Sequence, residues 1–498
     1  MDYPVEPLTD AERARLAPHV TNLDRPVFGL VNLPETVKGA LFARYSRYQG
    51  TLRRLFLDEF AGSLPEVDRP WDAGEGERAA TLYERIFLGY GDDSVAQLGG
   101  IHVACEWVSN VLTKVLQRPR LAAYLEQSTR YIPYDAPMPG GGYRYYRDPS
   151  LGPAYERALD ALFDTYAASL PKVAAWADAQ FPPPDGEPSA AHARAIQAKA
   201  LDLLRGLLPA ASLSHMGIYA TGQTYEQLIL HLLAHPLPEA RAYGRMLLDA
   251  VKAVIPSFVA RVERPERGGE WVSYLEQREQ AAERWVARLG LEGRAEDRDR
   301  PSVRLLHVDG DEDALLAALL FEAAGVSEEE TRIRLSALGP EERGALLADL
   351  VGARENRRHR PGRGFEALRY RFEIVSDYGA FRDLQRHRML TVQWQRLGPH
   401  LAGEGRGREA AYALCLGFRI RYVLDLNARE AMQLIELRSG REGHPSYRAV
   451  AHEMHRLIGQ VHPAVAAAMR HVDTEAEPRL ERILSEMRTQ AKRDALAR

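Results

Sequence analysis

Residues 118–131 read RPRLAAYLEQSTRY, and residues 386–399 read RHRMLTVQWQRLGP. Both stretches open with two arginines separated by one residue, and only the first continues, seven residues later, into Ser128-Thr-Arg130-Tyr. The second has Arg396 at the serine position and Gly-Pro in place of the distal Arg-Tyr. A repeated motif of this kind predicts two copies of one domain in a single chain, each of which keeps a part that the other has lost.

A second pair of stretches supports the repeat. Residues 422–438 read YVLDLNAREAMQLIELR, and residues 219–229 read YATGQTYEQLI, so that the two share Gln-Leu-Ile. The apolar spacing predicts an amphipathic helix in each copy, over 427–438 and 223–234. The first copy lacks the Asn and the Arg of the second and carries Leu232 at the position of Arg438.

These motifs resemble those of the flavin-dependent thymidylate synthases. That family has an Arg-His-Arg triplet, seven residues, and then Ser-x-Arg-Tyr, together with a helix that opens Asn-Ala-Arg and ends Leu-Arg. The segment Arg205-Gly-Leu-Leu-Pro209 resembles a further family segment, Arg-x-x-Leu-Pro. The resemblance covers roughly residues 30–256 and 300–475, and it implies an α+β, helix-rich fold with a mixed sheet and flanking helices in each copy.

The resemblance also implies an activity, which is reductive methylation of dUMP to dTMP with FAD as the cofactor. Methylenetetrahydrofolate would supply the carbon and NADPH would reduce the flavin. Guanidinium forks suit such a site because they form paired bonds to phosphate. The residues that match the family's nucleotide site are Glu126, Gln127, Ser128, Arg130, Arg205 and Arg438.

The second copy carries most of the residues that match the family's flavin site: Arg386, His387, Arg388, Asn427, Arg429 and Gln433. By the same resemblance Arg386, Arg438 and Ser128 would act in catalysis. From the residues alone, Asn427 is equally well explained as an ordinary helix N-cap and Arg429 as a solvated side chain. Since Pro119 replaces the family's histidine in the first copy, neither copy holds a complete set. We therefore expect one composite site that draws residues from both copies.

Length and composition agree with two domains. A chain of 498 residues exceeds what a single core usually supports. We expect a first domain over 1–256, a helical linker over 257–299, and a shortened second domain with a helical tail over 300–498. Because the family builds each site from several subunits of a tetramer, two fused copies imply a homodimer.

Charge and hydropathy exclude several classes of protein. The net charge of −4 argues against a general nucleic-acid binder, in spite of the basic run Arg357-Arg-His-Arg360. No apolar run is long enough for a membrane helix and no secretory leader is visible, so that a cytoplasmic location is expected. His452 and His455 are one residue too close for the HExxH zinc pattern, and no metal is expected. The alternative to an enzyme is a non-catalytic flavin- or nucleotide-binding relative that serves as a sensor or scaffold.

Overall fold

The computed structural model describes residues 3–64, 81, 96–138, 141–183, 189–291, 300–397, 408–475, 480 and 482–496. The chain folds as two compact units, and each unit takes three stretches of the sequence. Unit 1 comprises Met1–Leu170, Leu207–Gly293 and Leu397–Cys415, and unit 2 comprises Pro171–Gly206, Arg294–Arg396 and Leu416–Arg498. Residues 171–206 of the first copy therefore belong to unit 2, and residues 397–415 of the second copy belong to unit 1.

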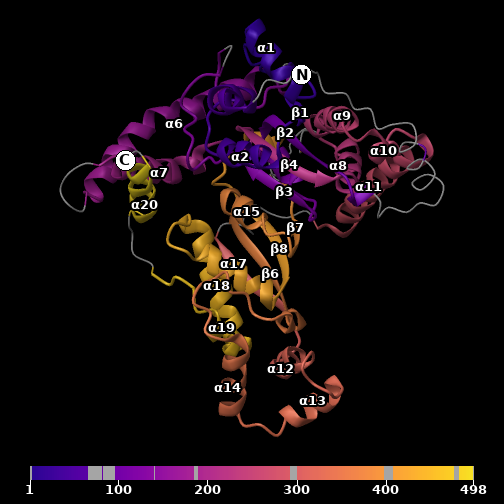
Figure 1. Cartoon of the computed structure of the whole chain (residues 1–498), viewed down its shortest axis with the longest axis vertical. Helices are drawn as coiled ribbons and strands as arrows, with labels where there is room; N and C mark the ends of the chain where they lie inside the picture. The colour runs from indigo at the N-terminus through magenta and orange to yellow at the C-terminus, as the bar shows by residue number, and fades with distance from the viewer. Residues whose placement is uncertain are drawn as a thin grey trace. The chain divides into compact units, whose positions relative to one another are not determined.

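Unit 1 contains a four-stranded sheet with the order β1-β2-β4-β3 (Figure 1). Its strands are β1 (Val27–Leu30), β2 (Gly100–Ser109), β3 (Ala122–Glu126) and β4 (Leu213–Thr221). Helix α5 (Asn110–Leu116) follows β2, and helices α8 (Gly222–Leu233), α9 (Pro238–Lys252) and α10 (Pro256–Val259) follow β4. Helix α11 (Glu270–Leu289) comes next and lies in the stretch expected to be a linker.

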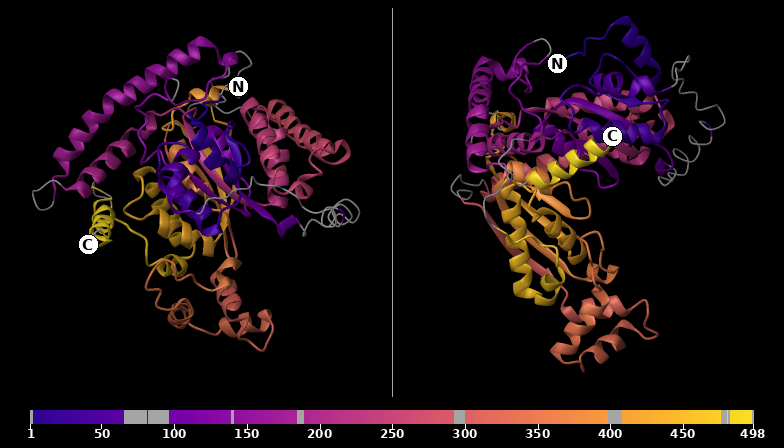
Figure 2. Two further views of the ribbon diagram at one scale, coloured as in Figure 1. Left: turned by 45° about the horizontal axis from the view of Figure 1, so that its top comes forward. Right: turned by 60° about the vertical axis from the view of Figure 1, so that its left-hand side comes forward.

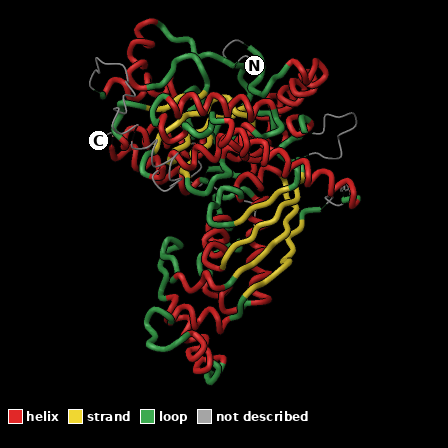
Figure 3. The backbone as a smooth tube through the Cα atoms, turned by 90° about the vertical axis from the view of Figure 1, so that its right-hand side faces the viewer, coloured by secondary structure: helices red, strands yellow, loops and turns green. Residues whose placement is uncertain are grey.

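Unit 2 repeats this succession with the sheet order β5-β6-β8-β7. Figure 3 draws the strands in yellow. Its strands are β5 (Ser302–Asp309), β6 (Arg369–Asp377), β7 (Thr391–Trp394) and β8 (Arg419–Asn427). Helix α15 (Tyr378–Leu384) follows β6, while α17 (Ala428–Arg438), α18 (Pro445–Val461) and α19 (Pro463–Ala468) follow β8. The prediction of two tandem α+β copies is confirmed. The expectation of mixed sheets is wrong in this detail, because every described strand pair is antiparallel.

The remaining helices lie outside this repeated core. In unit 1 they are α1 (Asp10–Leu16), α2 (Glu35–Tyr45), α3 (Leu52–Leu55) and α16 (Ala410–Ala413). In unit 2 they are α7 (Ala190–Leu204), α12 (Glu312–Leu320), α13 (Glu328–Leu335), α14 (Pro340–Val351) and α20 (Ile483–Leu496). Helix α6 (Gly152–Gln180) contains the boundary between the units, and α20 runs beside α7 (Figure 2).

The two sheets differ in how far they are buried. Strand β4 is buried along almost its whole length, because α2 covers one face of the sheet and a Cβ at Gly217 would lie 2.6 Å from the ring of Phe42. Strand β8 instead alternates buried and half-buried residues, as expected for a sheet with one face on a core. Helix α18 packs against β5 and β6 of that sheet.

The helix predicted over 427–438 is α17, which begins at Ala428 directly after Asn427, while residues 422–427 of the same motif are the end of strand β8. Arg386 lies in the turn after α15, which ends at Leu384. Gly398 and Pro399 lie outside the described residues. Within the described ranges, none of the helices combines the length and apolar character needed to cross a bilayer.

Candidate functional site

The end of β3 in unit 1 places Glu126 in a buried polar pair. Lys114 Nζ on α5 lies 3.0 Å from Glu126 Oε2, and the amide of Gln117 donates to the same oxygen at 2.9 Å. Both charged side chains are almost inaccessible, at 2% and 4% exposure. A buried carboxylate requires such a partner, so that Glu126 fixes β3 to α5.

Gln127 is held by two further contacts. Its amide donates to the carbonyl oxygen of Tyr48 at 2.5 Å, and its Oε1 accepts from the guanidinium of Arg144. Arg144 is buried, and its Cζ lies 5.2 Å from the ring centre of Trp107 and 5.4 Å from that of Tyr134. Burial lowers the pKa of Arg144. None of the sequence motifs contains Arg144, although its setting in Tyr143-Arg144-Tyr145-Tyr146 is an aromatic context for a cation.

A β-bulge brings Trp107 into this cluster. The register of β2 against β4 shifts between Cys105 and Val108, and Trp107 adopts a φ of 57°. Its backbone N–H donates to His215 Nδ1 at 3.1 Å, which leaves the imidazole proton on Nε2. Burial, and then the charge of Arg144, lower the pKa of His215 well below its usual range, so that the ring is neutral. Among the described residues, Arg144 Nε, Trp107 Nε1 and His215 Nε2 have no hydrogen-bond partner.

Ser128 and Arg130 form the next turn of unit 1. Ser128 N–H donates to Ser46 O at 3.2 Å, and Ser128 Oγ accepts the backbone N–H of Arg130 at 3.2 Å. Both side chains are half-buried. The buried Gln127 and Arg144 therefore support a turn that displays a hydroxyl and a guanidinium.

In unit 2, one carboxylate joins arginines from the two sequence copies. Arg205 of the first copy donates to Asp383 Oδ2 at 3.0 Å, and Arg386 of the second copy donates to Asp383 Oδ1. Arg205 and Asp383 are nearly inaccessible, while Arg386 is 41% exposed. The carboxylate sets the spacing of the two guanidinium groups.

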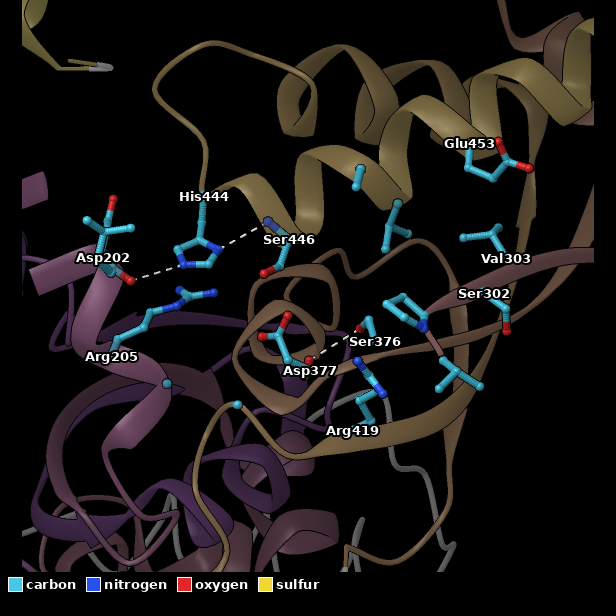
Figure 4. A pocket seen from close by; sticks show the side chains of 17 residues that line it. Asp202, Arg205, Ser302, Val303, Ser376, Asp377, Arg419, His444, Ser446 and Glu453 are labelled. Carbon is cyan, nitrogen blue, oxygen red and sulfur yellow. Dashed lines mark hydrogen bonds between the residues drawn. The ribbon is translucent and has the colours of Figure 1, made fainter. Parts of the chain in front are cut away.

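Arg205 also lines a pocket of about 510 Å³ that lies entirely in unit 2 (Figure 4). The close-up shows Arg205 and Asp202 on one side, His444 and Ser446 at the start of α18, and Arg419 with Asp377 on the sheet. His444 Nδ1 accepts the backbone N–H of Ser446 at 3.2 Å, and its Nε2–H donates to Asp202 O at 3.1 Å. Asp202 itself forms an ion pair with Arg482 at 3.1 Å.

His387 of the second copy is part of a buried chain of hydrogen bonds. Arg438 Nε donates to His387 Nε2 at 3.0 Å, and His387 Nδ1 lies 3.1 Å from Glu430 Oε1. An acceptor at Nε2 requires the proton on Nδ1, so that the neutral imidazole donates to Glu430. Burial lowers the pKa of His387 even though Glu430 opposes this shift. His387 links the Arg386–Arg388 turn to α17.

Helix α17 positions three further candidates. Asn427 is the N-cap, and its Oδ1 accepts the N–H of Glu430 at 2.9 Å. Arg429 donates to Pro361 O at 3.0 Å and lies 3.4 Å from Glu366. Gln433 is half-buried one turn later, while Arg388 is exposed on the turn after α15.

The structure thus divides the predicted residues between the units. Unit 1 holds Glu126, Gln127, Ser128 and Arg130, and unit 2 holds Arg205 with all the candidates from Arg386 to Arg438. His452 and His455 do not contribute to the candidate site, because each binds a backbone carbonyl oxygen through Nε2.

Comparison with known proteins defines the family. Residues 57–257 and 401–464, together more than half of the chain, match the model of the thymidylate synthase complementing protein family. The chain belongs to this family. A UPF0159 protein of Chlamydia pneumoniae is 36% identical over 516 residues, with 94% of this chain and 96% of the relative covered. A UPF0159 protein of Chlamydia muridarum is also 36% identical and covers 96% of this chain and 98% of its own length.

A more distant relative and one solved structure complete the comparison. A UPF0159 protein of Thermoplasma acidophilum is 29% identical, with 91% of this chain and 99% of the relative covered. The crystal structure of PolB from Streptomyces cacaoi, a UMP/dUMP methylase bound with 5-Br dUMP, is similar over 34% of this chain and 95% of its own. That alignment has 18% identity and a TM-score of 0.28. Family membership supports a thymidylate synthase-like role in nucleotide methylation.

The donor set of unit 2 is compatible with a flavin adenine dinucleotide. Arg386 and Arg388 present exposed guanidinium groups, which suit a pyrophosphate, and Gln433 offers an amide. Asn427 uses its oxygen as a cap and retains its amide hydrogens as donors. His387 does not fit as a direct donor, because both ring nitrogens are engaged by protein groups.

Proposed function

We propose that this protein catalyses the reductive methylation of dUMP to dTMP, with FAD as cofactor and with methylenetetrahydrofolate and NADPH as co-substrates. The observation that supports this best is the meeting of Arg205 and Arg386 on Asp383. Arginines from both sequence copies, each within a family motif, lie in one unit on one carboxylate. A site that needs both copies agrees with the incomplete motif set of each copy taken alone.

The chain's own groups would act by binding and orientation. Ser128, Arg130, Arg205 and Arg438 would bind the nucleotide, with guanidinium groups on its phosphate and on the oxygens that gain charge as the pyrimidine is activated. Glu126 and Gln127 would hold the turn that carries Ser128. Arg386, Arg388, Asn427, Arg429 and Gln433 would hold FAD, which supplies the hydride when bound.

Titration of the purified chain with dUMP tests the binding residues. Arg130→Ala and Arg438→Ala should each weaken binding by roughly 30-fold or more, since removing one partner of a buried charge pair costs about 2–5 kcal/mol. Arg456→Ala is the control and should bind like wild type, because Arg456 is exposed on α18, pairs with Glu453 and belongs to none of the proposed sites. Unchanged binding in Arg438→Ala, or two equivalent sites per chain, would contradict a composite site.

A visible spectrum tests the chemistry. We expect the purified protein to carry a flavin band that NADPH bleaches and that dUMP with methylenetetrahydrofolate restores. We also propose that the protein is a homodimer, which light scattering can measure directly. A monomer at micromolar concentration would contradict the dimer without affecting the chemistry.

A sensor or scaffold is the second candidate function. It is favoured by the engagement of Gln127 and His387 with protein partners, which occupies groups that a ligand would otherwise use. Such a protein would bind dUMP or flavin and show no dTMP formation. Product analysis after incubation with all substrates separates the two functions.

A further inference from the structure

Helix α11 of unit 1 leaves a row of large apolar side chains on the surface. The helix packs against α8 and the helical turn Pro265–Gly269, and none of its 20 residues is buried (Figure 1). Trp271, Tyr274, Trp285 and Leu289 are between 45% and 60% exposed. At about 100° per residue these four side chains share one face of the helix. We call this row the α11 stripe, and an exposed apolar row of this kind marks an interaction surface.

The internal repeat indicates a helix as the partner of α11. Helix α20 is its counterpart in unit 2, because it follows α19 as α11 follows α10. Helix α20 packs against α7. Its Ile483 packs on a buried apolar cluster, and its Glu486 pairs with Arg194 of α7 at 2.8 Å. In unit 2 a second helix therefore covers the helix that corresponds to α11, while the large apolar side chains of α11 are exposed.

The charges at the two ends of α11 favour a second copy of the same helix in antiparallel orientation. Glu270 and Arg288 lie about five turns apart at 3.6 residues per turn, so that both flank the α11 stripe on the same side. The Arg288 Cζ lies 4.6 Å from the centre of the Trp285 ring, which keeps the guanidinium beside the stripe. An antiparallel pair brings Glu270 of each copy to Arg288 of the other. A parallel pair would instead oppose like charges at both ends.

The middle of α11 and its net charge also agree with a helix partner. Ala281 and Ala282 lie between the aromatic side chains at the two ends, and such small residues let two helix backbones approach closely. Four glutamates and three arginines give the helix a net charge of −1, so that a negatively charged lipid surface does not attract it. Two of the glutamates, Glu279 and Glu283, are bound by Arg408 of the same unit.

We propose that two copies of this chain associate through the α11 stripe as an antiparallel helix pair about a two-fold axis. In this arrangement Trp271 of one copy packs beside Leu289 of the other, and the alanines of the two helices meet where they cross. Aromatic side chains are the usual anchors of protein interfaces. The proposal rests on the homodimer proposed above and assigns its interface. Helix α11 lies outside the residues that match the family model.

Sedimentation equilibrium of the full chain measures the dissociation constant of the dimer. We expect Trp285→Ser to raise this constant by roughly 30-fold or more, because it removes an aromatic anchor from each copy. Trp176→Ser is the matched control, since Trp176 lies on α6 and is 50% exposed, compared with 53% for Trp285. The control variant should dimerise like wild type. Both substitutions change exposed side chains, so that both variants should fold like wild type.

Charge reversal tests the antiparallel orientation. Glu270→Arg and Arg288→Glu each bring like charges together twice in the symmetric dimer, and each should weaken association by roughly 10-fold. The double variant restores opposite charges with their positions exchanged, and it should recover most of the affinity of wild type. A double variant as weak as the single ones would contradict the antiparallel pairing of these ends.

The same measurements can overturn the interface as a whole. A wild-type chain that stays monomeric at micromolar concentration would do so, as would a Trp285→Ser variant that associates as tightly as wild type. An equal loss in Trp176→Ser would also count against the α11 stripe. Binding of a monomeric wild type to vesicles of anionic phospholipid would assign the stripe to a membrane surface instead. None of these results depends on dTMP formation, so that failure of the interface is distinguishable from failure of the proposed function.

Discussion

At the scale of single residues, Arg144 connects the candidate nucleotide turn to the interior of unit 1. Its guanidinium binds Gln127 and stacks between Trp107 and Tyr134. We expect Arg144→Met to reduce the free energy of unfolding by about 2–4 kcal/mol, because it leaves the buried Gln127 oxygen without a donor. Urea unfolding measures this change.

Arg147→Met is the control for that substitution. Arg147 is 31% exposed and lies over the ring of Tyr145 at 3.7 Å, so that its loss should cost less than about 1 kcal/mol. If the two variants were equally stable, Arg144 would not support the turn. dUMP affinity should fall in Arg144→Met and remain in Arg147→Met.

Glu239 gives unit 1 a pH-dependent stability. It is fully buried, and its Oε1 accepts the Ser109 N–H at 2.9 Å. Its Oε2 accepts the Ser109 hydroxyl at 2.7 Å and the Tyr412 hydroxyl at 2.8 Å. Burial raises its pKa from 4.5 to about 7 although these donors oppose the shift. Between pH 4.5 and pH 7 the native state keeps the proton on Glu239, while the unfolded chain releases it. The stability that this proton contributes is therefore fully present below pH 4.5 and is lost as the pH rises to 7.

We therefore expect Glu239→Gln to gain stability relative to wild type by about 2–3 kcal/mol between pH 5 and pH 8, from the pKa shift converted to free energy. Urea unfolding at the two pH values measures the gain. Glu276→Gln, on the exposed face of α11, should show no such dependence. A pH-independent difference between Glu239→Gln and wild type would show that Glu239 is ionised in the fold.

At the scale of elements, Asn427 and Thr221 hold equivalent positions at the starts of α17 and α8. Asn427 caps its helix by accepting a backbone N–H, while the Thr221 hydroxyl accepts no backbone N–H of α8 and donates instead to Thr224 Oγ1 at 3.3 Å. Asn427→Ala should therefore cost about 1 kcal/mol and Thr221→Ala only a few tenths. Chemical unfolding of the two variants measures this, and equal losses would contradict it.

A second substitution of Asn427 distinguishes helix capping from cofactor binding. Asn427→Asp keeps an acceptor for the Glu430 N–H and loses the amide donor. It should retain the stability of wild type and lose affinity for FAD. Retention of flavin in this variant would show that Asn427 caps the helix and does not bind the cofactor.

The sequence predicted elements better than their contacts. The apolar periodicity of 240–255 and 447–459 predicts helices, and the structure has α9 and α18 there. The alternation of apolar and polar residues over 365–375 predicts a strand, and the structure has β6 at Arg369–Asp377. The helix start at Asn427 was also correct. The strand over 422–427 is not apparent from the motif, because β8 runs directly into α17 without a turn residue between them. Arg144 and Glu239 could not be found, because their roles depend on partners distant in sequence.

At the scale of the whole molecule, each unit is completed by a segment from the other sequence copy. In unit 1, Ala210 N–H donates to Leu414 O at 2.7 Å, and Tyr412 stacks on Tyr146 at 4.6 Å. In unit 2, Arg194 pairs with Glu486 at 2.8 Å and Asp202 with Arg482. Neither sequence copy by itself contains all the segments of one unit.

Truncation tests this exchange of segments. A chain that ends at residue 415 keeps every segment of unit 1, and one that ends at residue 396 loses the segment that carries Tyr412. We expect cooperative thermal unfolding of unit 1 in the longer chain and a broad, lower transition in the shorter one. Equal transitions in the two chains would contradict the role of residues 397–415.

The exchanged segments also set the order in which the protein can mature during translation. Residues 207–293 leave the ribosome about a hundred residues before residues 397–415, a delay of roughly 5–20 s at ordinary elongation rates. For that time the nascent chain holds Glu239 and Tyr146 without their partner Tyr412. Unit 2 waits longer still, since Arg482 is made 280 residues after its partner Asp202. Neither unit is therefore complete until its exchanged segment has been translated, and the yield of the protein in a cell should depend on chaperones that protect an incomplete domain.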